Sequence, residues 1–311
     1  MLQSRGPAAE SINNLWWFMF WPGLVVYLIV MGLLVYVSVR KWRQPVSTNI
    51  DRPNEKVGNA LVWGGGVFIT TIIVGAVLIY TLQTGRNLSP LQGQGDVTIE
   101  VVGHMFWWEV NYLDHDITTA NELYVPVGQR VQMQLISRDV IHSFWVPKLQ
   151  GKMDVNPYET NYIWIEAAEP GVYQGLCAEY CGAQHANMYF EVIAVPPEEF
   201  DSWIAARQEV PSQPTTAQIQ RGQEVYFEAG CANCHAVRGV TDSIEIGVAA
   251  PDLTDFASRR TIGAGVVPNN RGNLGGWIVD PQGMKPGNNM PPTDLNSEDL
   301  VALLDYLETL R

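Results

Sequence analysis

Four soft donor side chains lie close together in the string CAEYCGAQHANM, residues 177–188. They are Cys177, Cys181, His185 and Met188. Two thiolates, an imidazole and a thioether favour copper, particularly cuprous copper, over magnesium or calcium. Zinc also binds thiolates and imidazoles, but a thioether is a poor zinc ligand. A mononuclear copper site needs only one thiolate, whereas two thiolates four residues apart can bridge two copper ions.

The same spacing would also suit one face of a helix. Gly175 and Gly182 interrupt such a helix, and the residues from Tyr189 onward have the composition of a strand. We therefore expect the four donors to lie on a loop between two strands.

Each ion of a copper pair needs an imidazole, and the chain has five histidines. His142, in the string DVIHSFWVPKL, lies 35 residues before Cys177, where we expect a strand to meet a loop. Its neighbours Phe144 and Trp145 can shield a metal ion from water. We therefore predict His142 as the second imidazole ligand, although a histidine taken alone is more often a surface or core residue.

A second constellation, CANCH, places Cys231, Cys234 and His235 within five residues. C-x-x-C-H is the attachment motif of haem c, in which both thiols bond the porphyrin edge and the histidine binds iron. In a cytosolic chain, the alternative for this motif would be a redox-active dithiol. In an exported chain, each of the two cysteine pairs could instead form a local disulfide. The surrounding segment is helical with long loops, and so small a domain needs a cofactor to fill its core.

The sixth iron ligand should be a methionine downstream of the motif, since a thioether raises the haem potential. Met284 and Met290 are the candidates. Met290 lies in GNNMPP, where prolines stiffen the chain that presents the sulfur, while Met284 could equally fill the core. We predict Met290.

Two uncharged apolar runs, at about 15–37 and 60–82, are long enough to cross a membrane. A signal peptide and a buried core helix are the alternatives, but the first run lacks a cleavage site and the second contains three consecutive glycines. We therefore expect residues 1–85 to form a transmembrane helical hairpin.

The loop between these runs carries most of the nearby positive charge, in Arg40, Lys41, Arg43, Arg52 and Lys56. The positive-inside rule places that loop in the cytoplasm. Both termini and the domains that follow the hairpin are then expected on the outer, periplasmic face of the membrane.

Residues 86–196 contain short runs rich in Val, Ile, Tyr, Phe and Trp between turn residues, which predicts an all-β sandwich or barrel. Residues 197–216 are expected to form a helix fragment and a flexible linker. Residues 217–311 are expected to form an all-α domain. The net charge of −13 argues against a nucleic-acid partner, which requires a basic surface.

HSFWVP followed by CAEYCGAQHANM resembles subunit 2 of cytochrome c oxidase, and the resemblance covers both spans and the β domain. It implies a cupredoxin-like Greek-key barrel with a dinuclear copper centre. Cys177 and Cys181 would bridge the ions, and His142, His185 and Met188 would bind from the sides. The resemblance also makes the backbone carbonyl of Glu179 a copper ligand.

The family further implies a magnesium ion at the boundary with the catalytic subunit, bound by the Glu179 carboxylate. Asp154 matches the family's acidic residue near that ion, and a turn aspartate is the alternative reading. The string GHMFWWEVNY resembles the family's aromatic electron-entry segment. Phe106 occupies the position of the entry tryptophan and is followed by Trp107 and Trp108, so the residue on the electron path stays open.

The run GGWIVDPQGMKPGNNMPP in residues 217–311 resembles the cytochrome c domain fused to this subunit in certain bacterial oxidases. The two resemblances imply the electron-input subunit of an oxidase in the bacterial plasma membrane, with oxygen reduced in a partner, subunit 1. Fusion would tether the donor and raise its effective concentration. The upstream donor would be a cytochrome bc-type or alternative complex, or a soluble carrier.

Three other functions remain possible from the sequence. A copper-containing nitric oxide reductase uses similar parts, a free-standing membrane electron carrier would have no catalytic partner, and a disulfide-stapled protein would bind neither cofactor.

Overall fold

The computed structural model describes residues 3–42, 55–89, 95, 97–241 and 250–311. These residues form two compact units. The first is Glu10–Ser89, and the second comprises Gln3–Ala9 and the described residues from 95 onward. Arg43 and Arg52, two of the charges in the predicted cytoplasmic loop, lie outside the described residues.

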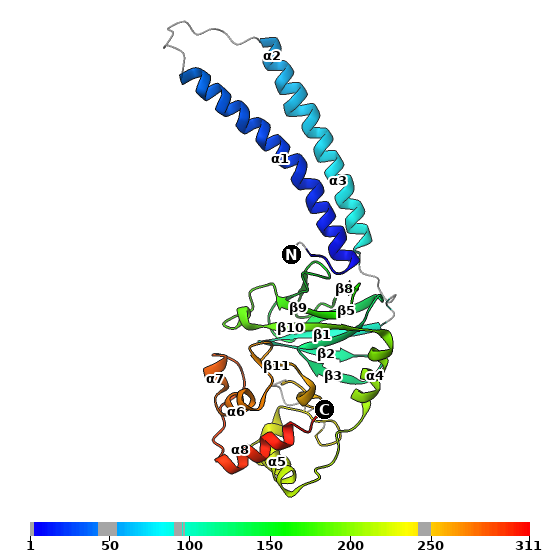
Figure 1. Ribbon diagram of the computed structural model, residues 1–311, viewed down its shortest axis with the longest axis vertical. Coiled ribbons are helices and arrows are strands. Elements are labelled where there is room, and N and C mark those ends of the chain that lie inside the picture. The colour runs from blue at the N-terminus through cyan, green and yellow to red at the C-terminus, as the bar shows by residue number, and fades with distance from the viewer. Residues whose placement is uncertain (1–2, 43–54, 90–94, 96, 242–249) are drawn as a thin grey trace. The chain divides into compact units, whose positions relative to one another are not determined.

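Two long apolar helices make up most of the first unit, and they run side by side in Figure 1. The first is α1, and the second is continuous through α2, a π-helical stretch η1 and α3. Both are long and apolar enough to cross a membrane. The ring centroids of Phe18 and Tyr80 lie 5.0 Å apart across the pair. The bounds are α1 Pro7–Trp42, α2 Glu55–Ala60, η1 Leu61–Ile69 and α3 Thr70–Asn87.

The predicted apolar runs lie inside these helices, which continue past them into polar sequence at both ends. The three glycines at 64–66 fall within η1, where the helix winds more loosely. The expected helical hairpin is therefore present.

Two five-stranded sheets form the β domain (Figure 1). One has the strand order β3-β2-β1-β5-β8 and the other β4-β10-β9-β6-β7. Two parallel pairings, β1 with β5 and β10 with β4, occur among antiparallel ones. The bounds are β1 Val97–His104, β2 Trp107–Tyr112, β3 Ile117–Ala120, β4 Glu122–Pro126, β5 Val131–Ser137, β6 His142–Trp145, β7 Met153–Val155, β8 Asn161–Ile165, β9 Gly171–Cys177 and β10 Tyr189–Val195.

The inner faces of the two sheets enclose one apolar core. β2 shows how the sequence produces this, because its residues alternate between half-buried and buried along the strand. The short helix η2, His185–Asn187, lies in the loop between β9 and β10. The expected all-β domain is thus present.

Helix α4, Pro197–Gln208, belongs to the β domain by its packing, although the sequence suggested a helix fragment within a linker. Its buried side chains Phe200, Trp203 and Ile204 join the core of the sheets. Trp203 stacks on Tyr124 with ring centroids 4.6 Å apart. Only residues 209–216 then connect the two domains without a helix or strand.

The helical domain has its own core, between α5 and α8 and the loops that join them. A two-stranded ribbon, β11 with β12, adds a small element that the all-α prediction lacked. Asn296 caps α8, because its side-chain oxygen accepts a hydrogen bond from the Asp299 amide. The bounds are α5 Ala217–Glu228, η3 Cys231–Asn233, η4 Phe256–Ser258, β11 Thr261–Ile262, β12 Val267–Pro268, α6 Arg271–Val279, α7 Pro281–Met284 and α8 Ser297–Leu307.

Buried polar contacts join the β domain to the helical domain, and we call this region the domain junction. The Thr119 hydroxyl donates to Asp255 Oδ2 at 2.8 Å, and both residues are buried. The backbone amide of Arg260 donates to Glu122 Oε1 at 2.6 Å, while Arg260 Nε donates to Glu191 at 2.7 Å. The two domains therefore share polar partners as well as a covalent link.

We predict that Gly222→Ala destabilises the helical domain. A methyl group at Gly222 would collide with the Ala302 carbonyl oxygen and lie 2.7 Å from Tyr306 Cβ, so α5 and α8 would have to separate. Such overpacking costs about 1–3 kcal/mol, measurable by urea unfolding. The control is Gly275→Ala in α6, where the nearest atom would be 3.6 Å away and where alanine should be neutral or stabilising. Equal effects of the two changes would contradict the close helix crossing.

We also predict that Glu122→Gln stabilises the protein above neutral pH. Burial raises the pKa of Glu122 to about 7, whereas the unfolded carboxyl titrates near about pH 4.3. As pH rises between these values the unfolded state loses its proton first, so stability falls by up to about 3 kcal/mol. Glutamine removes this loss, and urea unfolding at pH 4.5 and pH 8 measures it.

Glu191→Gln serves as the control. Glu191 is the other carboxylate that contacts Arg260, so this change removes a nearby negative charge while leaving Glu122 in place. This variant should keep the decline in stability. A decline that persists in Glu122→Gln would show that another group causes it.

Candidate functional site

The four donors of the first constellation and His142 converge on one buried point. The sulfur atoms of Cys177 and Cys181 lie 3.9 Å apart and form no disulfide. His142 Nδ1 is 3.8 Å from Cys177 Sγ, and His185 Nδ1 is 3.8 Å from Cys181 Sγ. The thioether of Met188 is also 3.8 Å from Cys181 Sγ. Two thiols thus form a central pair, with an imidazole on each side and a thioether against one of them.

Three adjacent strands hold these donors in place. His142 begins β6, Cys177 ends β9 and Met188 immediately precedes β10. The Cys177 amide donates to the Met188 carbonyl, and the amide of Ala178 donates to the Ser143 carbonyl. The loop between β9 and β10 carries Cys181 and His185, as the sequence suggested. Because the strands are hydrogen-bonded neighbours, the fold of the β domain brings the donors together.

Asp139, a residue that no sequence motif singled out, orients the His142 ring. His142 Nε2 lies 2.8 Å from Asp139 Oδ1. A carboxylate accepts, so Nε2 carries the proton and Nδ1 offers its lone pair toward Cys177. Burial alone would raise the pKa of Asp139, but hydrogen bonds from His142 and from backbone amides lower it below the usual range. Its position three residues before a candidate ligand was the available signal.

The two thiols oppose each other electrostatically. A hydrogen bond from Cys181 lowers the pKa of Cys177, against the opposing effect of burial. The hydrogen bond to Cys177 and burial raise the pKa of Cys181. Two thiolates at this distance repel each other, so bound metal ions would be needed to hold both. The donor set fits the copper pair expected from the sequence.

Glu179 and Asp154 occupy less enclosed positions. The backbone carbonyl of Glu179 lies 3.2 Å from Cys177 Sγ, within the donor cluster. Its carboxylate is exposed and lies 3.7 Å from Lys152 Nζ. Asp154 is an exposed residue of β7 opposite Ser143. The carbonyl thus lies beside the thiol pair, while the two carboxylates are exposed.

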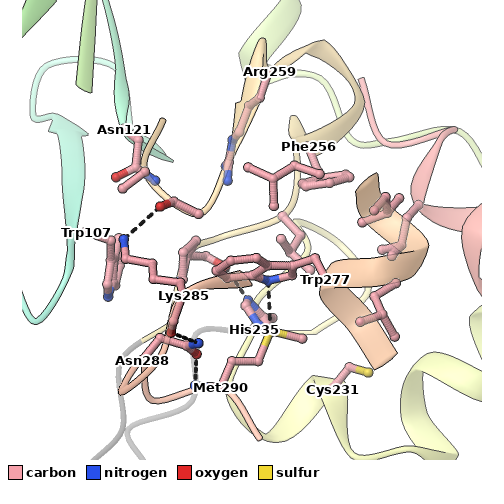
Figure 2. A pocket seen from close by; sticks show the side chains of 18 of the residues that line it. Trp107, Asn121, Cys231, His235, Phe256, Arg259, Trp277, Lys285, Asn288 and Met290 are labelled. Atoms are coloured by element: carbon pink, nitrogen blue, oxygen red, sulfur yellow. Dashed lines mark hydrogen bonds between the residues drawn. The ribbon is translucent and has the colours of Figure 1, made fainter. Parts of the chain in front are cut away.

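A cavity, which we call the His235 cavity, lies in the helical domain and extends to the β domain (Figure 2). His235 and Met290 both line it, together with Cys231. Cys234 is exposed, on the outer side of the same turn. Most of the other lining side chains are apolar, including Leu253, Phe256, Leu274, Ile278, Leu303 and Leu307. Such a wall fits a planar apolar ring system such as haem.

Hydrogen bonds orient both candidate iron ligands. His235 Nδ1 lies 2.7 Å from the Pro251 carbonyl oxygen, which can only accept, so Nε2 keeps a free lone pair. Burial lowers the pKa of His235, which favours the neutral imidazole that binds iron. Trp277 Nε1 donates to Met290 Sδ at 3.1 Å (Figure 2).

Met284, the alternative candidate, is not among the residues that line the His235 cavity. Its methyl group lies against Gly276 of α6 instead. The structure therefore places Met290, and not Met284, where a sulfur could face His235.

The three aromatic residues of the GHMFWWEVNY string have different surroundings. Phe106 and Trp107 line the His235 cavity. Trp108 is fully buried, and its ring centroid lies 5.8 Å from that of His142. The turn between β1 and β2 thus lies between the two constellations.

Comparisons with known proteins divide the chain in the same way. Residues 112–195 match the family model described as "Cytochrome C oxidase subunit II, periplasmic domain", and residues 219–311 match "Cytochrome c". A "Cytochrome c oxidase subunit 2" of Alkalihalophilus pseudofirmus is 36% identical over 100% of this chain and 90% of its own length. A Bacillus subtilis protein of the same name is 33% identical over 90% of this chain and 82% of its own.

We predict that Asp139→Asn weakens copper binding while leaving the fold intact. Asparagine can present its amide nitrogen or its oxygen to His142, so the ring loses the partner that holds its proton on Nε2. Losing such a partner typically costs about 10–100-fold in metal affinity, measurable by competition with a copper chelator. Asp154→Asn, an exposed change on the neighbouring strand, should leave the affinity unchanged. Equal affinity in both variants would exclude this role for Asp139.

Proposed function

Because this chain belongs to the cytochrome c oxidase subunit II family, we propose that it passes electrons from its own haem c through a dinuclear copper centre to the catalytic subunit. The electron-input role and membership of the oxidase complex follow from the family. The copper centre and the haem follow from the two matched domains. Beyond this, we propose which residues bind the copper ions and the haem, and that electrons pass from the haem to the copper pair.

The convergence of three side chains, those of His142, His185 and Met188, on the two central thiols supports the copper assignment. Cys177 and Cys181 would hold the two ions between them, with the other ligands at the sides. His142 and the Glu179 carbonyl bind on the Cys177 side, while His185 and Met188 approach Cys181. This soft donor set suits copper, which accepts and releases single electrons as it alternates between its cupric and cuprous states.

In the helical domain, Cys231 and Cys234 bind the porphyrin covalently, and His235 and Met290 bind its iron. The hydrogen bond from Trp277 orients the Met290 sulfur, and the Pro251 carbonyl orients His235. When bound, the haem and the copper pair would supply one-electron transfer, which requires no bond to form or break.

The protein's contribution is rigidity and exclusion of water. Trp108, Phe144 and Phe190 pack in a buried aromatic group beside His142. A ligand set fixed by strands and an apolar wall changes little when its charge changes. Little rearrangement is then required as an electron arrives and leaves.

We further propose the orientation and partners of the chain. Arg40 and Lys41 end α1 on the cytoplasmic side, so both termini lie on the periplasmic side. The exposed carboxylates of Glu179 and Asp154 are available to a magnesium ion at the boundary with the catalytic subunit. The upstream donor is a membrane complex or a soluble carrier that reduces the haem.

A copper-containing nitric oxide reductase is the alternative function. The related proteins carry the oxidase name, which favours oxygen as the final acceptor. Consumption of oxygen rather than nitric oxide by the purified complex separates the two.

The most direct test is a reciprocal pair of variants in the full chain. Cys181→Ser should abolish the copper-pair absorption and leave the haem spectrum intact, because only one bridging sulfur remains. Cys234→Ser should weaken covalent haem attachment and leave the copper spectrum intact. Optical spectra and metal content measure both. Survival of the copper-pair signal in Cys181→Ser would disprove the bridging assignment.

A further inference from the structure

The segment Lys285–Met290, which we call the methionine loop, contacts the β domain through three side-chain hydrogen bonds. Lys285 Nζ donates to the Phe106 carbonyl at 2.8 Å. Asn289 donates to the Met105 carbonyl at 3.2 Å, and Gln184 donates to the Pro286 carbonyl at 2.7 Å. The loop that presents the proposed iron ligand is therefore attached to the domain that holds the copper donors.

Lys285 is an unusual residue for this position. Its side chain is 2% exposed, and it lines the His235 cavity (Figure 2). Nζ donates to one carbonyl in each domain, that of Phe106 and that of Gly263, the latter at 2.7 Å. Among the described residues no carboxylate forms an ion pair with it. Burying an amine is costly, and two carbonyls from different domains compensate it only while the domains stay together.

The turn that Lys285 holds also touches the copper site. The Phe106 ring lies 3.1 Å from the point where a Cβ of Gly182 would be, and Gly182 follows Cys181 directly. The Met105 amide donates to Asp139 Oδ2 at 2.7 Å, and Asp139 in turn holds His142. Direct contacts therefore connect the methionine loop with the Met105–Phe106 turn. From this turn they continue through Gly182 to Cys181, and through Asp139 to His142.

The rest of the domain junction supports a fixed arrangement. Thr119 and Asp255 form a buried hydrogen bond at a separate place, and Arg260 binds Glu122 and Glu191. The Tyr189 amide, at the start of β10, donates to the Ala264 carbonyl. The helical domain is thus held at several points, which a loosely tethered domain would not require.

We propose that Lys285 is a positioning residue that seats the methionine loop on the Met105–Phe106 turn, so that the haem works from one docked position. This inference rests on the proposed function, since it concerns how that same haem reaches the copper pair. It replaces the tethered-donor picture from the sequence, in which a linker at residues 197–216 tethers the donor and raises its effective concentration.

The two pictures differ in their dependence on linker length. For a loosely tethered domain, effective concentration falls as about the −3/2 power of linker length, so a fourfold longer linker lowers it about eightfold. For a domain already docked, extending the linker changes almost nothing. Gly-Ser repeats inserted after Pro211, beyond the Val210 side chain that lies against Gly239, therefore discriminate between them without replacing a residue of the domain junction.

The experiment uses the assembled oxidase with copper and haem bound, and measures reduction of the copper pair after photochemical reduction of the haem. With the native Lys285, a fourfold longer linker should change the rate less than about twofold. In Lys285→Met, the same extension should slow transfer more than in the native protein, and by less than the roughly eightfold of a fully tethered domain because the contacts of the domain junction remain. Arg271→Met is the control, because it removes a cation whose partners, Asp305 and Glu308, lie within the helical domain.

A second measurement does not depend on electron transfer. Hydrogen exchange at the Met105 amide and in the methionine loop should accelerate in Lys285→Met and stay unchanged in Arg271→Met. A purely structural role would lower the stability of the helical domain or the haem potential without creating linker dependence.

Several outcomes would overturn the inference. Linker dependence in the native protein would show that the domain is not docked, and linker independence in Lys285→Met would show that Lys285 does not seat it. Absence of copper or haem from the purified complex would instead overturn the proposed function, so the two failures are distinguishable.

Discussion

The sulfur atoms of Cys177 and Cys181, held 3.9 Å apart without a bond between them, impose the constraint on which the rest of the site depends. Two thiolates this close repel each other. Bound cations would relieve the repulsion and allow both sulfurs to act as ligands. The strands β6, β9 and β10 serve to keep these groups together, and Asp139 keeps His142 facing them.

The sequence is most informative where chemistry is local. Cys177 to Met188 and the CANCH motif carry their ligand types at short spacing, so both candidate sites can be predicted from residue types and spacing alone. The two apolar helices and the alternating strands follow from composition and period. The prolines beside Met290 favour it over Met284, and the structure places it on the cavity wall for a tertiary reason, the indole of Trp277.

The sequence is least informative where partners are distant along the chain. Asp139 looks like an ordinary turn residue until its carboxylate meets His142 and Met105. Helix α4 resembles part of a linker because its apolar residues are few, yet they complete the core of the sheets. Lys285 gives no signal at all, since its two carbonyl partners lie 179 and 22 residues away. Contacts of this kind depend on the packing of two domains, which no local pattern encodes.

The central claim concerns two metal ions sharing two sulfurs, and electron paramagnetic resonance of the oxidised full-length protein tests it most directly. One unpaired electron shared equally by a copper pair should give a hyperfine pattern from two equivalent copper nuclei, with two coppers per chain by metal analysis. A pattern from a single copper nucleus, with one copper per chain, would contradict the claim.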